Sequence, residues 1–140
     1  MHYNFLEKIG VSAEEAFLNY NFAPPTLRRD IGILGLLHKR VLGLGHPIFQ
    51  QLFPFIVDVG GDQLYAGHDK QLHSHLSEAN FQLSMFCRSI FGMTYVYNLL
   101  SQDIVNCEKV SAFQTSLTKH ARKLCESGDP NWSLCFSCRK

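Results

Sequence analysis

The residues best suited to chemistry are four potential metal ligands toward the C-terminal end of the sequence. His120, Cys125, Cys135 and Cys138 follow the pattern H-x4-C-x9-C-x2-C, and thiolates combined with an imidazole are ligands that zinc accepts. Only Cys135 and Cys138 form a closely spaced pair, whereas structural zinc sites usually draw on two such pairs. The two other residues fall at the end of a predicted helix. The pattern therefore favours unliganded thiols over a zinc site.

The sequence carries no recognisable catalytic motif. His68, His73 and His75 lie in a polar stretch, residues 62–80, that is typical of an exposed loop. No motif sets a cysteine or histidine nucleophile beside a base, and the glycines at 43–45 do not extend into a phosphate-binding loop. The adjacent aspartates with which polymerases hold two Mg²⁺ ions are also missing. We therefore expect neither an enzyme nor a bound cofactor.

Basic residues are concentrated in two parts of the chain. Around one predicted helix stand Arg28, Arg29, Lys39 and Arg40. Over residues 27–54 these four cations are set against one acid, for a net charge of +3, and residues 108–140 also carry +3. The middle, residues 55–107, carries −3 although it includes Arg88. Basic ends around an acidic middle indicate a surface for a polyanion, even though the whole chain has a net charge of only +1.

Two amphipathic helices are expected to position these side chains. The first runs from about Leu27 to Leu42, with two prolines before it, Thr26 as its N-cap and Gly43 just beyond its end. Its apolar stripe repeats every three or four residues: Leu27, Ile31, Leu34, His38 and Val41, widened by Leu36, Leu37 and Leu44. The second helix carries a similar stripe: Val110, Phe113, Leu117, Ala121 and Leu124. Its start remains open between Asn106 and a capping box formed by Ser111 and Gln114.

The other predicted elements are short. Ser12 and Glu15 match a capping box, so a helix is expected directly after Ser12. The remaining elements follow in chain order: one or two helical turns at 48–53, a short strand at 55–57, a surface loop or hairpin at 62–80, a strand or helix at 81–86, a helix at 88–100 and a turn at 103–105. Residues 127–140 show no assignable pattern.

These elements define one region, residues 1–140, of mainly α class. Helical parts at about 12–54 and 81–126 enclose a polar loop at about 55–80, and an irregular tail follows at 127–140. The expected fold is a small helical fragment with a few short strands or a hairpin in the middle. A hydrophobic content of 46% and a charged content of 18% are those of a globular chain.

The sequence also indicates an intracellular protein, in the cytoplasm or nucleus. Its first residues lack the basic and apolar regions of a signal peptide, and no apolar run approaches the length of a membrane span. Five cysteines, an odd number with irregular spacing, argue against a secreted disulfide framework.

Two stretches together resemble the reverse transcriptases of LINE-type (non-LTR) retrotransposons. The first, Leu27 to Lys39 (LRRDIGILGLLHK), is similar to the basic and apolar helix that follows the polymerase core. The second begins with Arg88-Ser89-Ile90-Phe91, continues with Tyr97-Asn98-Leu99-Leu100-Ser101 and ends with the Phe113 segment, Val110 to Leu117. The family usually has an Asn-x-Leu-Pro turn, whereas this chain has Ser101 in place of the proline. The matched parts span roughly residues 12–125.

The resemblance implies a non-catalytic C-terminal fragment or remnant, from the thumb and tail that follow the palm. Such a region would help to hold RNA and nascent DNA, here through Arg28, Arg29, Lys39, Arg40 and Arg88. The implied partners are a weakly bound RNA or RNA–DNA duplex and the remainder of the parent polymerase, with no membrane.

The alternative is a small helical protein-interaction module. Its anchors would be exposed aromatic side chains, namely Phe81, Phe86, Tyr95 and Tyr97. A shared exposed basic face would favour nucleic-acid binding, and scattered or acid-paired arginines would favour the interaction module.

Overall fold

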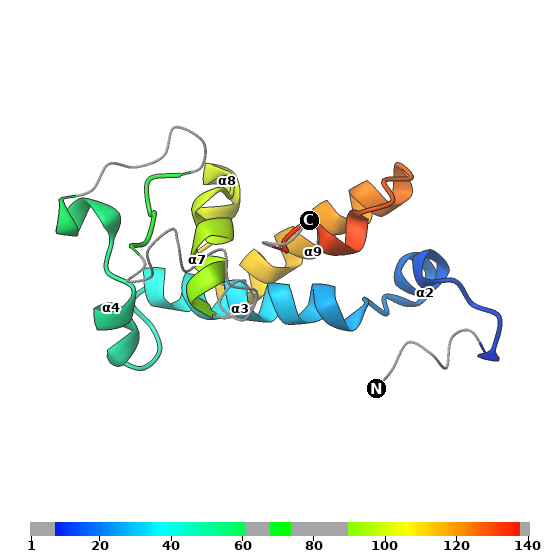
Figure 1. Ribbon diagram of the computed structural model, residues 1–140, viewed down its shortest axis with the longest axis horizontal. Coiled ribbons are helices and arrows are strands. Elements are labelled where there is room, and N and C mark those ends of the chain that lie inside the picture. Colours follow the sequence, from blue (N-terminus) through cyan, green and yellow to red (C-terminus); the bar gives the residue numbers. More distant parts are fainter. Residues whose placement is uncertain (1–7, 61–67, 74–89, 138–140) are drawn as a thin grey trace.

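The computed structural model describes residues 8–60, 68–73 and 90–137. Its helices, in chain order, are α2 (Ala13–Tyr20), α3 (Pro25–Val41), α4 (Ile48–Leu52), the 3₁₀ helix η1 (Ile56–Val59), α7 (Ile90–Asn98), α8 (Gln102–Val105), α9 (Val110–Glu126) and the 3₁₀ helix η2 (Trp132–Leu134). The described residues contain no extended strand, only one isolated bridge. The prediction of a mainly α fold is therefore confirmed (Figure 1).

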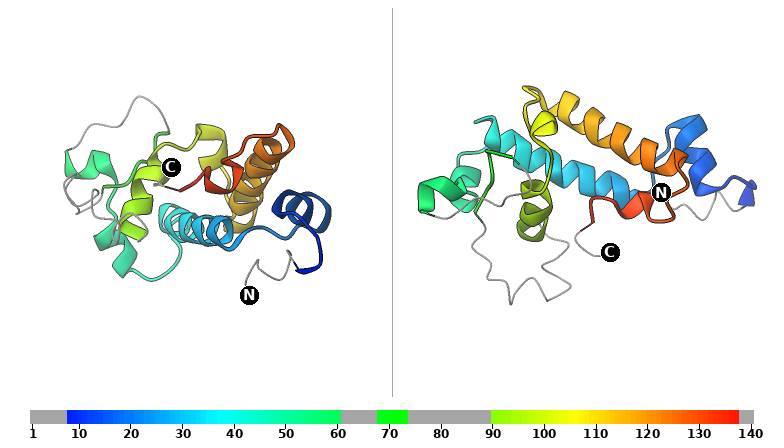
Figure 2. Two further views of the ribbon diagram at one scale, coloured as in Figure 1. Left: turned by 45° about the vertical axis from the view of Figure 1, so that its right-hand side comes forward. Right: turned by 90° about the horizontal axis from the view of Figure 1, so that it is seen from above.

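The long helix α3 forms the axis of the molecule. It runs along much of the molecule's length, and α7 and α9 pack against it (Figures 1 and 2). Its buried apolar side chains repeat every three or four residues, together with one histidine: Leu27, Ile31, Leu34, Leu37 and His38. The predicted stripe is thus confirmed, although Val41 is only half-buried and both Leu36 and Leu44 are exposed. In α9 the buried residues are Phe113, Leu117, Ala121 and Cys125, so Cys125 takes the place predicted for Leu124.

The ends of the two long helices differ from the prediction. Pro24 is the N-cap of α3 and Pro25 its first residue, so the prediction of Thr26 as N-cap is wrong. A proline suits the first helical position because its fixed φ is already helical and its missing N–H would have no partner there. The N-cap of α9 is Lys109, in extended conformation and without a side-chain cap, rather than Asn106 or Ser111.

The Ser12 half of the capping box predicted for α2 is confirmed. The Ser12 hydroxyl oxygen accepts a hydrogen bond of 3.1 Å from the backbone N–H of Glu15, and Glu14 and Glu15 lie in the first turn. Asn21 ends the helix in the left-handed conformation, with φ 55°. Its backbone N–H donates to the carbonyl oxygen of Phe17 at 3.1 Å.

The strand predicted at 55–57 is wrong. Phe55 forms a single antiparallel bridge with Leu72, and the chain then turns directly into η1. Pro54 precedes the bridge and has no N–H to donate, so the ladder cannot extend in that direction. The strand or helix predicted at 81–86 and most of the loop predicted at 62–80 lie outside the described residues. The turn predicted at 103–105 is instead the short helix α8.

The segment 68–73 is tied to the end of α7 by Asn98. The side-chain oxygen of Asn98 accepts from the N–H of Leu72 at 2.8 Å, and its side-chain nitrogen donates to the carbonyl of Leu72 at 2.9 Å. This pair of bonds satisfies both backbone groups of Leu72, which is buried. Asn98, the last residue of α7, thus has a structural reason for being an asparagine.

Candidate nucleic-acid interface

The basic side of α3 is the part of its surface formed by Arg28, Arg29, Gly32, Leu36 and Lys39, all exposed. Arg28 and Lys39 are eleven residues apart, which is close to three full turns and brings both to one side of the helix. Arg29 and Leu36 are seven residues apart, close to two turns, and adjoin them. Three of the five predicted nucleic-acid contacts therefore share one exposed surface.

Local contacts orient two of these cations. The guanidinium of Arg28 lies over the ring of Phe22, 5.4 Å from its centroid, which leaves the edge of the guanidinium for a further ligand. The aliphatic part of Lys39 lies beside Gly45, because a Cβ built on Gly45 would be 3.6 Å from Cδ of Lys39. Gly45 itself has φ +84°, which favours glycine in the turn after α3.

Arg40 does not belong to the basic side. It is only 8% exposed, and its Nε donates a hydrogen bond of 2.8 Å to the carbonyl oxygen of Phe53. Its guanidinium also lies 4.4 Å from the centroid of the Phe55 ring. This corrects the expectation that Arg40 faces a phosphate, because here Arg40 holds the chain after α4 against the end of α3. Arg88 lies outside the described residues.

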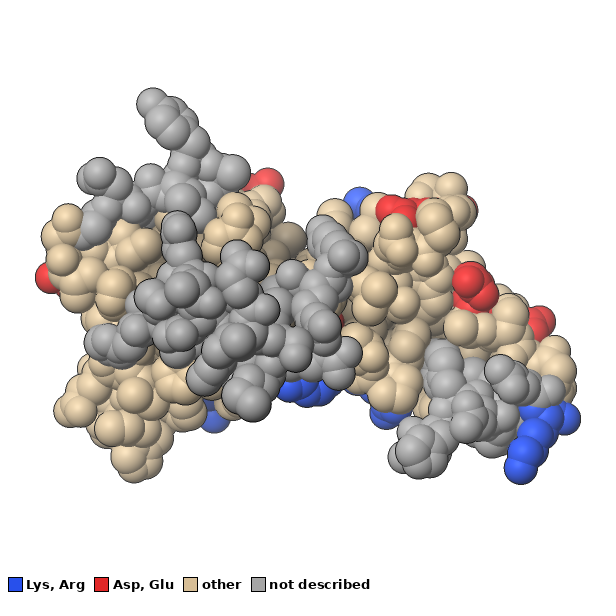
Figure 3. Space-filling view, in the orientation of Figure 1, with Lys and Arg blue, Asp and Glu red and all other residues tan. Residues whose placement is uncertain are grey.

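The charges on the surface of the molecule are segregated. Figure 3 shows most of the Lys and Arg atoms of this face along its lower edge, in small groups below the course of α3 and in a larger group at the lower right below α2, and most of the Asp and Glu atoms along the upper and right edges.

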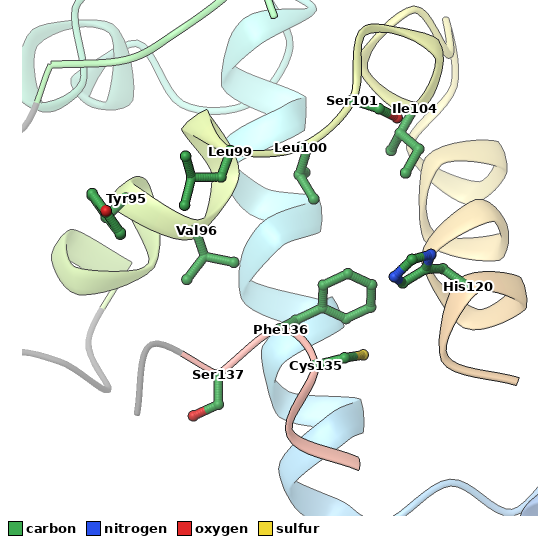
Figure 4. Close-up of a pocket in the computed structure, with 10 residues that line it drawn as sticks. All are labelled: Tyr95, Val96, Leu99, Leu100, Ser101, Ile104, His120, Cys135, Phe136 and Ser137. Carbon is green, nitrogen blue, oxygen red and sulfur yellow. The ribbon is translucent and has the colours of Figure 1, made fainter. Parts of the chain in front are cut away.

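An apolar groove lies between α7, α8, α9 and the chain after η2. It has a volume of about 550 Å³ and is lined mainly by apolar side chains, with Tyr95 and Leu99 exposed at 51% and 44% (Figure 4). Tyr95 thus fits the alternative of a protein-interaction module. Tyr97 does not, because it is fully buried, and Phe81 and Phe86 lie outside the described residues.

The described residues do not assemble the potential zinc ligands. No three His, Cys, Asp or Glu side chains among them lie close enough together to hold a metal ion. His120 and Cys135 line the apolar groove (Figure 4). Cys125, by contrast, is buried in α9. Burial, together with Glu14 and Glu126, raises the pKa of the Cys125 thiol and opposes the thiolate form that binds zinc. Cys138 lies outside the described residues.

A buried polar network, which the sequence did not reveal as such, joins α3 to α7. His38 makes hydrogen bonds of 2.9 Å to the Tyr97 hydroxyl and 2.7 Å to the carbonyl of Cys107, and its ring stacks on Phe113 with 4.1 Å between centroids. His68 contacts the carbonyl of Tyr97 at 2.9 Å. A histidine in the apolar stripe of α3 was the one sequence feature that pointed to this network. The network is buried and thus serves the fold rather than a ligand.

The basic side of α3 and the apolar groove are therefore the two candidate sites of the described residues. None of the described helices combines the length and hydropathy needed to cross a membrane. No family model, curated protein or solved structure matches the chain.

Proposed function

We propose that this chain is a non-catalytic C-terminal part or remnant of a non-LTR retrotransposon reverse transcriptase and that it binds RNA or an RNA–DNA duplex through the basic side of α3. In the parent polymerase the same surface would support template and product, and the rest of that polymerase would be its protein partner. The chain itself catalyses no polymerisation, since its sequence lacks the paired aspartates that hold the metal ions.

The observation that carries this proposal is the exposed basic side of α3. Arg28, Arg29 and Lys39 present three positive charges on one surface, with no acidic side chain among the residues that define it. Arginine and lysine at such positions bind phosphates and release condensed counterions, which is the main source of affinity in nucleic-acid binding.

The packing of the helices supports the suggested origin. The described parts of the stretches that carry the resemblance lie in α3, in α7 with the turn after it, and in α9, and α3 packs against both of the other helices. They therefore belong to one packed unit. Asn98, in the turn that resembles the family's Asn-x-Leu-Pro, makes the pair of bonds to Leu72 that holds this unit together.

A salt titration of duplex binding tests the proposal. We expect affinity for an RNA–DNA duplex to fall linearly with the logarithm of salt concentration. The triple variant Arg28→Ala, Arg29→Ala, Lys39→Ala should then weaken binding and reduce the slope by about 2 to 3, because each lost phosphate contact removes about 0.7 to 0.9. Fluorescence anisotropy with a labelled duplex measures both quantities.

The matched control removes equal charge elsewhere. Lys109, Lys119 and Lys123 are exposed at or along α9, and their replacement by alanine should leave most of the affinity and slope in place. The nucleic-acid proposal fails if the unmodified chain does not bind at low salt or if the control weakens binding as much as the triple variant does.

The apolar groove supports the second candidate, a protein-interaction module. Tyr95 and Leu99 stand exposed at this groove, and exposed aromatic and aliphatic side chains beside a cavity are typical of binding anchors. The variant Tyr95→Ser with Leu99→Ser leaves the basic side of α3 intact. The second candidate gains if the unmodified chain binds no duplex at low salt but binds a peptide that this variant no longer binds. Loss of duplex binding by this variant would instead make the groove a nucleic-acid contact and count against the second candidate.

A further inference from the structure

The middle of the basic side of α3 carries no charge and almost no side chain. Gly32 lies between Arg28 and Leu36, and a Cβ built on it would meet no atom within 4 Å. Packing within the described residues thus does not require a glycine there, although glycine in a helix interior is unfavourable. At Gly35, by contrast, a Cβ would lie 3.0 Å from Cδ of Gln114. The backbone of α3 is therefore left open at Gly32 for close approach from outside.

Leu36 gives this middle an apolar character. It is 45% exposed and lies one turn from Gly32, on the same side of the helix. Arg28 and Lys39 flank the pair and are about 16 Å apart along the helix axis, at 1.5 Å per residue. The basic side therefore has cations at both ends and a flat, uncharged centre.

Such a surface fits a ligand that carries two separated rows of phosphates. A single strand laid along α3 would bring phosphates over Gly32 and Leu36, where no side chain can donate to them. A duplex groove instead presents one phosphate row on each side, with sugars and base edges between the rows. The uncharged centre would then face the sugars.

The packing of α3 decides which groove it can reach. Its other sides are buried against α7 and α9, so only about a third of its circumference is open. The major groove of B-form DNA is about 8.5 Å deep and requires a helix to insert, and its minor groove is only about 6 Å wide. The minor groove of an A-form duplex is wide and shallow, and a helix can rest on it without inserting.

We propose that the basic side of α3 lies across the shallow minor groove of an A-form duplex, either double-stranded RNA or an RNA–DNA hybrid. Arg28 and Arg29 contact phosphates of one strand, Lys39 contacts the other, and Gly32 and Leu36 rest against the sugars. This inference rests on the proposed function, because it names the form of nucleic acid that the same surface binds.

Competition between duplexes of equal sequence and length tests the duplex form. The full chain is titrated with RNA–RNA, RNA–DNA and DNA–DNA duplexes and with single-stranded RNA at one salt concentration. We expect the two duplexes that contain RNA to bind about tenfold more tightly than the DNA duplex or the single strand. The DNA duplex lacks the A-form shape and the 2′-hydroxyls, and the single strand has no groove. Comparison of the RNA duplex with the hybrid identifies the preferred source of the A-form groove.

A bulky residue at position 32 tests the close approach. Gly32→Gln should weaken binding to the A-form duplexes by about tenfold, because the added side chain keeps the helix away from the sugars of the groove. The salt slope should stay unchanged, because the substitution removes no charge. Gly32→Ala is the control and should bind within about twofold of the unmodified chain. Both variants should keep their helical circular dichroism, since alanine and glutamine favour a helix more than glycine does.

The outcomes separate this inference from the proposed function. Equal affinity for A-form and B-form duplexes, or unchanged binding by Gly32→Gln, overturns the groove inference. The proposed function survives either result if binding still depends steeply on salt and on Arg28 and Arg29. Absence of binding to every nucleic acid overturns both.

Discussion

His38 and His68 are buried, and their hydrogen bonds determine which ring nitrogen carries the proton. A carbonyl oxygen only accepts, so Nε2 of His38 must donate to Cys107 and Nε2 of His68 to Tyr97. Nδ1 of His38 then accepts from the Tyr97 hydroxyl, and Nδ1 of His68 accepts from the N–H of Lys70. Each ring is thus held in a neutral tautomer. A second proton on His68 would face the Lys70 N–H, a donor against a donor.

We expect the free energy of unfolding to fall as the pH is lowered below about 6.5. Burial lowers the pKa of both histidines from the ordinary value of 6.5, although Asp69 opposes this shift at His68. In this range the unfolded chain binds protons that the folded chain does not, so stability decreases with falling pH. Well above 6.5 the rings are neutral in both states and the effect disappears. Urea unfolding between about pH 7.5 and 5 measures the slope.

Replacement of the two rings identifies their share of the slope. Glutamine can donate and accept but does not titrate, so His38→Gln with His68→Gln should flatten the pH dependence, as should His68→Gln alone to a smaller extent. His120 is exposed on α9, and His120→Gln serves as the control. An unchanged slope in the double variant would show that other groups cause the acid sensitivity.

Individual contacts explain why the candidate interface could be predicted only in part. Arg28, Arg29 and Lys39 are exposed because they lie opposite the apolar stripe, which can be read from spacing alone. By its spacing Arg40 should also lie outside the apolar stripe and be exposed. It is nevertheless buried by Phe53 and Phe55, which return to α3 only after the turn at 43–47. A contact of this kind depends on the path of the chain and cannot be inferred from helix periodicity.

The close crossing of α3 and α9 depends on Gly35. A Cβ at this position would lie 3.0 Å from Cδ and 3.3 Å from Cγ of Gln114, whose side-chain nitrogen points to the carbonyl of Ile31 at 3.4 Å. Gln114 therefore occupies the space that the missing side chain leaves. Interlocking of this kind fixes how closely the two helices approach.

We expect Gly35→Leu to destabilise the fold by about 1 to 3 kcal/mol, because the added side chain overfills the crossing and displaces Gln114. Gly32→Leu on the open side of the same helix is the matched control. It should be neutral or stabilising by up to about 1 kcal/mol, since leucine favours a helix more than glycine does. Urea unfolding followed by circular dichroism measures both variants. Equal stability of the two would mean that α9 does not pack as closely as this crossing requires.

The elements themselves divide into those that local sequence determines and those that it does not. Periodic apolar spacing was sufficient for α3 and α9, and a hydroxyl three residues before an acid was sufficient for the start of α2. The short elements were less predictable. The apolar run at 55–57 has the composition of a strand, but Pro54 limits the pairing and η1 forms instead. The prediction of strands or a hairpin in the middle failed for the described residues for this reason.

The two ends of the described chain are joined far from the helix crossing. Arg122 of α9 donates to the carbonyl of Leu18 at 3.1 Å and to the Asn21 side chain at 2.7 Å, and it lies over the ring of Phe17. Trp132 of η2 stacks on the opposite end of the sequence, with its ring centroid 5.0 Å from that of Phe17. Sequence patterns gave no assignment for residues 127–140, because a single aromatic residue that inserts into a distant cluster leaves no periodicity.

Trp132 therefore connects α2 and the chain after α9 into one core. It is 3% exposed, its ring is nearly parallel to that of Phe17, and its indole N–H donates to Glu14 at 3.3 Å. We expect Trp132→Ala to destabilise the fold by about 3 to 5 kcal/mol, because it removes the stack and leaves a cavity beneath α2. Tyr20→Ala is the matched control, since Tyr20 lies on α2 but is 71% exposed and should change stability by less than about 0.5 kcal/mol. Circular dichroism during urea unfolding measures both variants.

Trp132 is the sole tryptophan of the chain, so its fluorescence in the unmodified protein should shift to longer wavelength in the same transition. A shift at lower urea than the loss of helix would instead show that α2 and η2 separate from the rest of the molecule before α3 and α9 unfold.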